Sequence, residues 1–232
     1  MTTPLHLENL ESHTADRLVD VVLASGWQAR ACLTCSFQAE DIIVLNLLRK
    51  RVPQIPVLFL ETGYHFAETY RFRDRLVHEW NLNLVNVMPK LSVAQQESQL
   101  GILYRNDPAR CCHLRKVEPL FEALEAFDLW FTGLRREQSP TRRNLQKVED
   151  HRLPSGKAIL KINPLADWTW ANVWEYSGAN HLNYLPQYDQ GYASIGCEPC
   201  TALPQDPNHP RSGRWSGKKL ECGIHTFSER TQ

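Results

Sequence analysis

The sequence predicts an α/β fold in which a parallel sheet carries helices on both faces. Segments with strand character alternate along the chain with segments of helical periodicity. One strand candidate, residues 55–60, is apolar at every position, which is typical of a strand covered on both faces. Alternation of strands with helices joins neighbouring strands in parallel, because each helix returns the chain to the same edge of the sheet.

The first quarter of the chain supplies one helix, one strand and a second helix. Leucines and valines recur at helical spacing from about residue 7 to 25, and Gly26 is expected to end this amphipathic helix. A strand is expected over residues 29–36, followed by a helix over 41–51. Cys32 and Cys35 form a Cys-x-x-Cys pattern inside this strand, which favours buried packing residues over a redox pair.

The middle of the chain continues the alternation. After the apolar strand, Gly63 opens a turn into a long helix that reaches residue 80, and residues 82–87 read as a third strand. A helix over 116–126 and a strand over 129–132 complete the pattern. Ligands of such sheets bind beyond the carboxyl ends of the strands, so three segments are candidate binding loops: 36–41, 61–63 and 133–143.

The amino-acid composition changes from Asn163 onward, where the alternation of strands and helices ends. Trp168, Trp170 and Trp174 lie on a predicted short helix and are expected to be core residues, and the remainder is rich in loops. We predict a single domain over residues 1–232, in which 1–205 form the α/β core and 206–232 a C-terminal tail that carries catalytic residues.

Composition narrows the classes of partner. The 232 residues contain 26 Lys plus Arg and 26 Asp plus Glu, so no overall charge favours nucleic acid or an anionic membrane. The start of the chain lacks the pattern of an export signal, and no segment approaches the ~18 apolar residues of a membrane span. We therefore expect a cytoplasmic protein, in which seven cysteines serve as ligands or catalysts more readily than as disulfides.

Four cysteines form a candidate metal site. Cys111 and Cys112 are adjacent, and Cys197 and Cys200 make a Cys-x-x-Cys motif, so together they can supply four thiolates. Adjacent cysteines point in different directions and suit an iron–sulfur cubane better than a single zinc ion. Zinc, and cysteines with a structural or disulfide role, stay open on these patterns alone.

A fifth cysteine, Cys222, is a candidate nucleophile. Lys218, Lys219 and His225 flank it, and nearby positive charge favours the reactive thiolate. The alternative is an exposed tail cysteine with incidental neighbours.

Arginines and one loop are candidate anion sites. The group Arg135, Arg136, Arg142 and Arg143 can bind phosphate or sulfate through bidentate guanidinium contacts, or can be a solvated surface run. The loop that starts at Ser36 lies between a strand and a helix, where backbone N–H groups can face a phosphate.

The combination of motifs resembles the assimilatory adenylyl-sulfate (APS) reductases of the phosphoadenylyl-sulfate (PAPS) reductase family. The matching blocks are Ser36-Phe-Gln-Ala-Glu-Asp41, Glu61-Thr-Gly63, Cys111-Cys112-His-Leu-Arg115-Lys116-Val-Glu-Pro-Leu120, Thr132-Gly-Leu-Arg-Arg136, Asn163-Pro-Leu-Ala-Asp-Trp168, Gly191-Tyr-Ala-Ser-Ile-Gly-Cys197-Glu-Pro-Cys200-Thr201 and Glu221-Cys222-Gly-Ile-His225. They run from residue 36 to residue 225 in the family's order.

The resemblance implies an adenine-nucleotide hydrolase-like fold, a 4Fe-4S cluster and thioredoxin-dependent reduction of APS to sulfite and AMP. Cys111, Cys112, Cys197 and Cys200 would hold the cluster, and Cys222 would carry an S-sulfocysteine intermediate. Retention of all four cluster cysteines favours APS over PAPS. The substrate-binding residues that the resemblance implies are Ser36 and Arg143 near the nucleotide, and Lys116, Arg211, Arg214 and His225 around the phosphosulfate.

Two departures from the family pattern bear on this interpretation. Gln38 stands where the nucleotide loop often has glycine. The chain also lacks the fused thioredoxin-like domain of some relatives, so the reductant is expected to be a separate thioredoxin or glutaredoxin-like dithiol protein.

Three alternative functions stay open. The alternatives are a PAPS or dual-substrate reductase, a zinc-binding interaction module, and an RNA-thiolating relative of the ATP-pyrophosphatases. The last predicts a Ser-Gly-Gly phosphate loop and a basic RNA face, and the sequence contains neither. The sequence does not decide the oligomeric state, so a homo-oligomer stays open.

Overall fold

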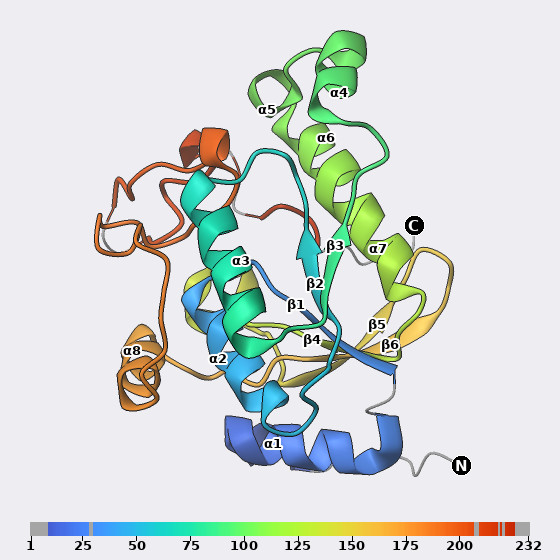
Figure 1. Ribbon diagram of the computed structural model, residues 1–232, viewed down its shortest axis with the longest axis vertical. Helices are drawn as coiled ribbons and strands as arrows, with labels where there is room; N and C mark the ends of the chain where they lie inside the picture. Colours follow the sequence, from blue (N-terminus) through green and yellow to red (C-terminus); the bar gives the residue numbers. More distant parts are fainter. Residues whose placement is uncertain (1–8, 28–29, 207–208, 218, 220, 226–232) are drawn as a thin grey trace.

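A six-stranded sheet forms the centre of the computed structural model, which describes residues 9–27, 30–206, 209–217, 219 and 221–225 (Figure 1). The strand order is β3-β2-β1-β4-β6-β5, and every neighbouring pair is parallel except β5 with β6. The strands are β1 (Ala31–Thr34), β2 (Val57–Leu60), β3 (Leu84–Val87), β4 (Leu129–Phe131), β5 (Val148–Arg152) and β6 (Ala158–Ile162). The predicted α/β class is confirmed.

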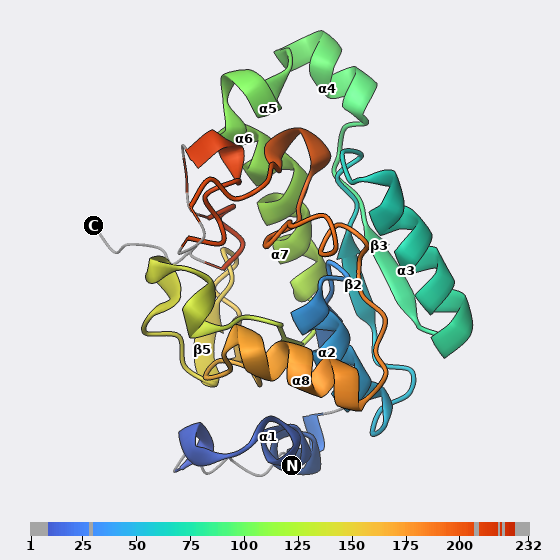
Figure 2. The ribbon, with the colours of Figure 1, turned by 90° about the vertical axis from the view of Figure 1, so that its left-hand side faces the viewer.

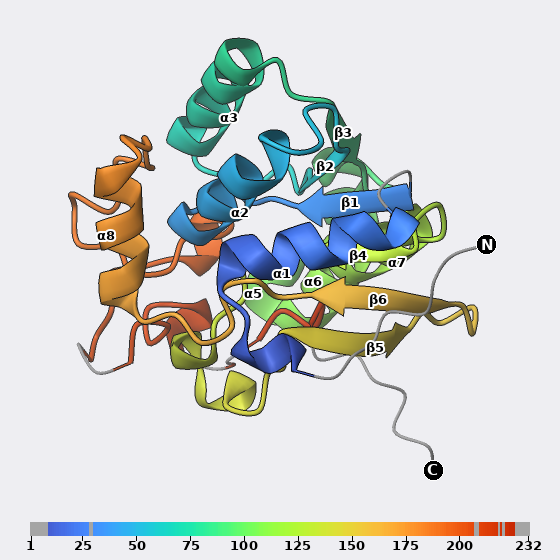
Figure 3. The same cartoon turned by 90° about the horizontal axis from the view of Figure 1, so that it is seen from below.

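Helices cover both faces of this sheet (Figure 3). The α-helices are α1 (Ala15–Val22), α2 (Ala39–Arg49), α3 (Ala67–Trp80), α4 (Val93–Leu100), α5 (Leu103–Asn106), α6 (Pro108–Cys112), α7 (Glu118–Leu124) and α8 (Trp170–Ala179). Shorter 3-10 and π-helical turns are η1 (Leu10–Ser12), η2 (Leu23–Trp27), η4 (His113–Val117), η5 (Arg136–Gln138), η6 (Pro140–Arg142), η7 (Glu198–Cys200) and η8 (Trp215–Gly217).

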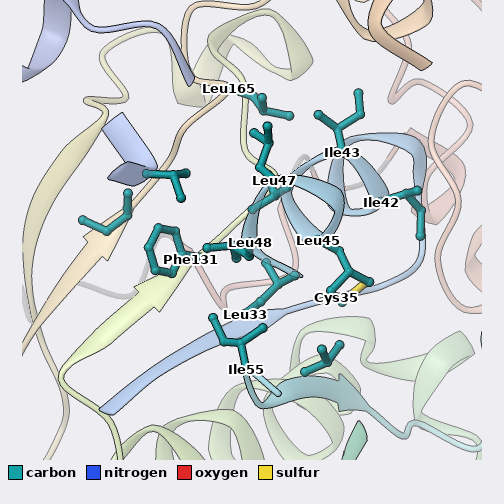
Figure 4. Close-up of a cluster of buried hydrophobic side chains, with 14 of the residues drawn as sticks. Leu33, Cys35, Ile42, Ile43, Leu45, Leu47, Leu48, Ile55, Phe131 and Leu165 are labelled. Atoms are coloured by element: carbon teal, nitrogen blue, oxygen red, sulfur yellow. The ribbon is translucent and has the colours of Figure 1, made fainter. Parts of the chain in front are cut away.

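Alternate residues of each strand enter different hydrophobic cores. Leu33 and Phe59 pack with α1, α2 and α3 on one face, whereas Cys32, Leu58 and Trp130 pack with α7 on the other. This division follows from the two-residue period of a strand. Figure 4 shows the first core, where apolar side chains of α2 meet residues of the strands.

The N-terminal helix is divided in two, which corrects the prediction of one helix over 7–25. Residues 7 and 8 lie outside the described part, η1 ends at Ser12, and α1 begins at Ala15. The hydroxyl of Thr14 accepts a hydrogen bond from the backbone N–H of Arg17, so Thr14 caps the start of a new helix. The apolar periodicity of the sequence shows no break at this point. Gly26 has φ +88°, consistent with its predicted role at the helix end.

The hairpin of β5 and β6 was not expected from the sequence. β5 reads Val-Glu-Asp-His-Arg and lies at the edge of the sheet, where charged residues are tolerated and the strand pattern is weak. β6 continues the parallel order beside β4.

The helix predicted from residue 116 begins much earlier. Its first segment, α6, starts at Pro108, and the carboxylate of Asp107 accepts a hydrogen bond from the N–H of Arg110. η4 and α7 then continue the helical path, so Cys111 and Cys112 end α6. Figure 2 shows the C-terminal segment (red) beside this helical stretch, where the ideal Cβ position of Gly223 lies 3.2 Å from Val117.

Among the residues described, no helix combines the length and the apolar character needed to cross a membrane. Cys32 and Cys35 are buried, as predicted. The three tryptophans that were expected in the core are only partly buried against it, and Trp168 lies before α8 and not on it.

Candidate active site

A cavity of about 430 Å³ opens at the carboxyl ends of the central strands. The loop after β1 (36–41) and the segment after β4 (133–142) line it, together with residues 193–196 and 210–215. The predicted loop 61–63 does not line this cavity, although its neighbours Leu60 and His65 do. Thr62 of this loop lines a second cavity beside the cysteines. The parallel order of β2, β1 and β4 brings these loops together.

Asp41 organises the loop that begins at Ser36. Its carboxylate accepts hydrogen bonds of 2.6 Å from both the backbone N–H and the hydroxyl of Ser36. Burial raises the pKa of Asp41 to about 6, against the opposing effect of the hydrogen bonds from Ser36 and from the N–H of Gly133. A Cβ atom at Gly133 would lie 2.4 Å from Asp41 Oδ1, so glycine permits this contact between the ends of β1 and β4.

Gln38 has a structural role that explains the departure from glycine. Its backbone has φ −73° and ψ 164°, which any residue adopts, so glycine is not required here. Its side-chain amide donates to the Ser36 hydroxyl at 3.0 Å and accepts from the N–H of Ile195 at 2.8 Å. Gln38 therefore joins the loop to the segment that precedes Cys197.

The four predicted arginines lie in different environments. Arg135 forms a buried ion pair with Glu40 at 2.9 Å and also contacts Glu137, while Arg136 pairs with Glu11. Arg142 lines the cavity, whereas its neighbour Arg143, the predicted residue, is exposed and lies outside the cavity wall.

Cys222 is half-buried and lines the same cavity as the Ser36 loop. Lys219, one of its predicted cationic neighbours, lies over the ring of Trp215 at 5.0 Å, and Lys218 lies outside the described residues. Lys116 lines both cavities. Burial opposes its charge, but the nearby sulfurs of Cys197, Cys222 and Cys112 raise the pKa of Lys116, which keeps it cationic.

Arg211 and Arg214, which were predicted to bind the phosphosulfate, line the cavity from the C-terminal segment. Both guanidinium groups donate to the hydroxyl of Ser194 at 3.3 Å, and Arg214 also donates to the carbonyl of Cys200 at 3.2 Å. A cation pair is thus held by the segment that contains Cys197 and Cys200.

His225 also lines the cavity and stacks on Trp130, with ring centroids 5.5 Å apart. Burial, aided by Lys161 and two arginines, lowers the pKa of His225 well below its ordinary value, so the ring is neutral near pH 7. Its buried Nδ1 has no hydrogen-bond partner among the described residues.

The four predicted cluster cysteines line the second cavity. Cys111 and Cys112 come from the end of α6, while Cys197 precedes η7 and Cys200 ends it. All seven cysteines are free thiols, and Cys197 Sγ lies 3.3 Å from the hydroxyl of Thr62. Burial raises the pKa of Cys111 to about 12 and that of Cys200 to about 11.

Four thiols around one cavity are a donor set that fits a tetrathiolate metal group, because a metal cation offsets the cost of ionising buried thiols. In the described part of the chain, no three His, Cys, Asp or Glu side chains already stand at metal-binding positions. The fit rests on the thiol chemistry of the four cysteines and on their common cavity.

Comparison with known proteins places this chain in a family. A model of the phosphoadenosine phosphosulfate reductase domain matches residues 30–203. The chain belongs to the phosphoadenosine phosphosulfate reductase family. The match includes β1 to α8 and all four cysteines of the second cavity.

Curated members of the phosphoadenosine phosphosulfate reductase family are similar over most of the chain. Adenosine 5'-phosphosulfate reductase of Geobacillus kaustophilus is 45% identical over 82% of this chain and 81% of its own length. Adenosine 5'-phosphosulfate reductase 2 of Bacillus subtilis is 39% identical over 93% and 94%. Phosphoadenosine 5'-phosphosulfate reductase of Gloeobacter violaceus is 43% identical over 94% and 93%.

Solved structures agree with this family assignment. Phosphoadenylyl-sulfate reductase from Candida auris aligns with a TM-score of 0.70 at 25% identity, over 85% of this chain and 98% of that one. FMN adenylyltransferase of Candida glabrata aligns at 0.59 and 15% identity, over 87% and 66%, which shows a shared fold.

Sequence reasoning gave no role to three residues of the site and named Arg142 only as one of four candidate anion-binding arginines. Arg142, Ser194 and Gly196 line the cavity, and Glu221 contacts Arg142 just before Cys222. The Glu-Cys-Gly motif could have drawn attention to Glu221. Nothing in the sequence distinguishes Arg142 from Arg143, because their burial depends on a segment about eighty positions away.

Proposed function

We propose that the chain reduces adenosine 5'-phosphosulfate to sulfite and AMP, with electrons from a thioredoxin or glutaredoxin-like dithiol protein. The observation that carries the proposal is that Cys222 lines the same cavity as the loop after β1 and the cations of the C-terminal segment. The similarity to proteins named adenosine 5'-phosphosulfate reductase supports this substrate.

In this proposal the nucleotide binds near the loop of Ser36. The phosphosulfate lies toward Lys116, Arg211, Arg214 and His225, which share the cavity with Cys222. Arg143 was expected near the nucleotide, but its exposed position leaves Arg142 as the arginine of this pair at the cavity wall.

The first chemical step is attack of the Cys222 thiolate on the sulfur of the sulfate group. An S–S bond forms and the S–O bond to the phosphate breaks, so AMP leaves with the electron pair and Cys222 carries an S-sulfocysteine. Both reactants are anionic, and the cations Lys116, Arg211 and Arg214 reduce their repulsion.

The second step needs an external dithiol. One of its thiolates attacks Cys222 Sγ, a disulfide forms, and sulfite leaves with the electron pair of the broken S–S bond. The second thiol of the partner then releases Cys222, so the partner loses two electrons and ends as a disulfide. We place the protein in the cytoplasm, where dithiol partners stay reduced.

We also propose that Cys111, Cys112, Cys197 and Cys200 hold a 4Fe-4S cluster. Their common cavity and free thiols support this, and adjacent cysteines fit a cubane better than a single zinc ion. When bound, the cluster would place a fixed charge beside Lys116, whose side chain reaches both cavities.

A second candidate is reduction of PAPS, or of both nucleotides. It is favoured by the 43% identity to the Gloeobacter violaceus protein named phosphoadenosine 5'-phosphosulfate reductase. The retained cysteines favour APS, and a direct competition between the two nucleotides separates the candidates.

The test is sulfite and AMP release by anaerobically purified protein with thioredoxin and either APS or PAPS, with iron content and absorbance recorded on the same sample. We expect turnover of APS, a brown iron-loaded protein and little activity on PAPS. Comparable activity on PAPS would overturn the substrate, and bound zinc in place of iron would overturn the cluster.

The matched variant is Cys222→Ser. We expect it to bind AMP as the wild type does but to form no S-sulfocysteine and no sulfite, because serine lacks the thiolate nucleophile. Mass spectrometry after incubation with APS measures the modification. A sulfonate found on another cysteine of this variant would refute the role of Cys222.

A further inference from the structure

Glu221, the residue before Cys222, forms a buried ion pair with Arg142 of η6. Arg142 Nε donates to Glu221 Oε1 at 2.9 Å and its Nη2 donates to Oε2 at 2.7 Å, which is a bidentate contact. The side chains are 9% and 8% exposed. The hydroxyl of Thr141 donates to the same carboxylate at 2.9 Å, and Arg211 lies 3.6 Å from it.

The position of the pair distinguishes two roles. Arg142 and Cys222 line the cavity, whereas Glu221 does not. The carboxylate therefore contacts Arg142 without being part of the cavity wall, and it does not stand in for a bound anion. This arrangement indicates that Glu221 orients its neighbour Cys222. It does not indicate that Glu221 blocks the cavity until substrate displaces it.

A second contact fixes the other side of Cys222. His225 stacks on Trp130. Gly223, which lies between Cys222 and His225 in the chain, turns the backbone with φ +104°. A Cβ at Gly223 would lie 3.2 Å from Val117 Cγ2, so the turn passes close to the helical stretch. Cys222 is thus held between the Glu221–Arg142 pair and the ring stack, four residues apart in the chain.

We infer that Glu221 and Arg142 are positioning residues, whose ion pair fixes the Cys222 sulfur at the cavity for attack on the substrate. This inference rests on the proposed function. A buried ion pair gains little net stability, because desolvation offsets the attraction, but removing one partner leaves an uncompensated charge. Its contribution is a defined geometry, and misplacing a reacting atom by about 1 Å can slow a reaction about a hundredfold.

The test compares Glu221→Gln, Glu221→Asp and Arg142→Lys with the wild-type holoenzyme. Glu221→Gln keeps the size of the side chain but removes the charge, Glu221→Asp keeps the charge, and Arg142→Lys keeps a cation without the bidentate geometry. Glu11→Gln is the matched control, because Glu11 also pairs with an arginine of a distant segment, at 2.6 Å from Arg136, but this arginine, unlike Arg142, does not line the cavity.

Two measurements are made on each protein. The first is the rate of S-sulfonation of Cys222 by APS in single turnover, together with kcat and KM. The second is the rate at which iodoacetamide alkylates Cys222, followed by peptide mass spectrometry. The second measurement does not depend on the natural substrate, so it tests the pair even when neither APS nor PAPS reacts.

We expect Glu221→Gln and Arg142→Lys to lower the sulfonation rate and kcat by about tenfold to a hundredfold. KM should stay close to the wild-type value in Glu221→Gln, because Glu221, unlike Arg142, does not line the cavity. Alkylation of Cys222 should become faster, since its segment loses an anchor. Glu221→Asp should recover part of the rate, which a role in overall folding would not predict, and Glu11→Gln should match the wild type in both measurements.

Three outcomes would overturn the inference. One is an unchanged sulfonation rate in Glu221→Gln, and another is an alkylation rate in Glu221→Gln that equals that of the wild type. The third is a lower KM with a faster sulfonation rate, which would identify Glu221 as an inhibitory plug. Loss of APS and PAPS turnover in the wild type, with the alkylation differences intact, would reject the proposed function and retain the anchoring pair.

Discussion

At the scale of single residues, Gly196 makes room for a cation of the site. A Cβ atom there would lie 2.1 Å from Nη2 of Arg214 and 2.5 Å from its Cζ. The guanidinium occupies this space while it donates to Ser194 and to the carbonyl of Cys200. Glycine before Cys197 is therefore explained by a neighbouring side chain and not by a turn, because no positive φ is found at this position.

Gly196→Ala is expected to displace Arg214 and to raise KM for APS at least about tenfold, because the anion loses a fixed cation. Steady-state kinetics and the Kd of AMP measure the effect. Gly178→Ala is the control, since Gly178 lies in α8 with nothing within 4 Å of the added Cβ. An equal KM in the two variants would show that Arg214 does not bind the substrate.

The cysteines show what residue types can reveal without a structure. Cys222 is distinguished by its cationic neighbours, and the structure places it at the cavity. Cys32 and Cys35 have the spacing of a redox pair, but their place in a buried strand indicated packing, and the structure agrees. The surrounding pattern was thus more informative than the spacing.

At the scale of elements, a buried carboxylate joins the ends of β1 and β4. Asp41 accepts hydrogen bonds from Ser36 and is close to Gly133, while Glu40 beside it raises its pKa further. The two loops that frame the cavity therefore share one titrating group, which is neutral in acid and ionised near pH 7.

Asp41→Asn is expected to change how stability depends on pH. The pKa of Asp41 is raised from 3.8 to about 6 on folding, so the folded protein binds this proton more tightly than the unfolded chain. Its contribution to the free energy of unfolding is complete below pH 3.8 and is lost as the pH rises to about 6, by at most about 3 kcal/mol.

Urea unfolding at several pH values measures this effect. Relative to Asp41→Asn, the wild type should lose stability across that interval and then change no further. The exposed Asp150→Asn variant controls for removal of a carboxylate. Parallel curves for the wild type and Asp41→Asn would contradict a raised pKa.

Elements with a clear apolar pattern were predictable from the sequence. The apolar strand β2 and the helix α3 were recognised from continuous and periodic apolar residues. The break between η1 and α1 and the early start of α6 depend on caps at Thr14 and Asp107, which apolar periodicity does not reveal. The edge strand β5 is polar and has no strand pattern of its own, and its pairing with β6 makes it a strand.

At the scale of the whole molecule, the second cavity joins two distant parts of the chain. Cys111 and Cys112 belong to α6, and Cys197 and Cys200 to the loops after α8. A metal group held by all four would cross-link these parts, close a long loop and so stabilise the folded state.

Removal of iron by an anaerobic chelator is expected to lower the Tm and to expose the loops around η7 to proteolysis, because that cross-link is lost. Calorimetry and limited proteolysis of loaded and iron-free protein measure the change. Cys200→Ser should reproduce it, whereas Cys222→Ser should retain the iron and the wild-type Tm. A Tm that does not respond to iron loss would contradict a cluster that joins the two parts.

The sequence by itself determined the alternation of the central strands and helices, the set of four cysteines and the separate position of Cys222, because apolar periodicity and the spacing of chemical groups are local properties. The tertiary structure decided that Arg142 and not Arg143 lines the cavity, that Gln38 joins its loop to Ile195, and that Glu221 anchors Cys222. Each of these depends on contacts with residues far away in the chain. Adjacent side chains point in different directions, so only the packing of distant segments selects the one that reaches the site.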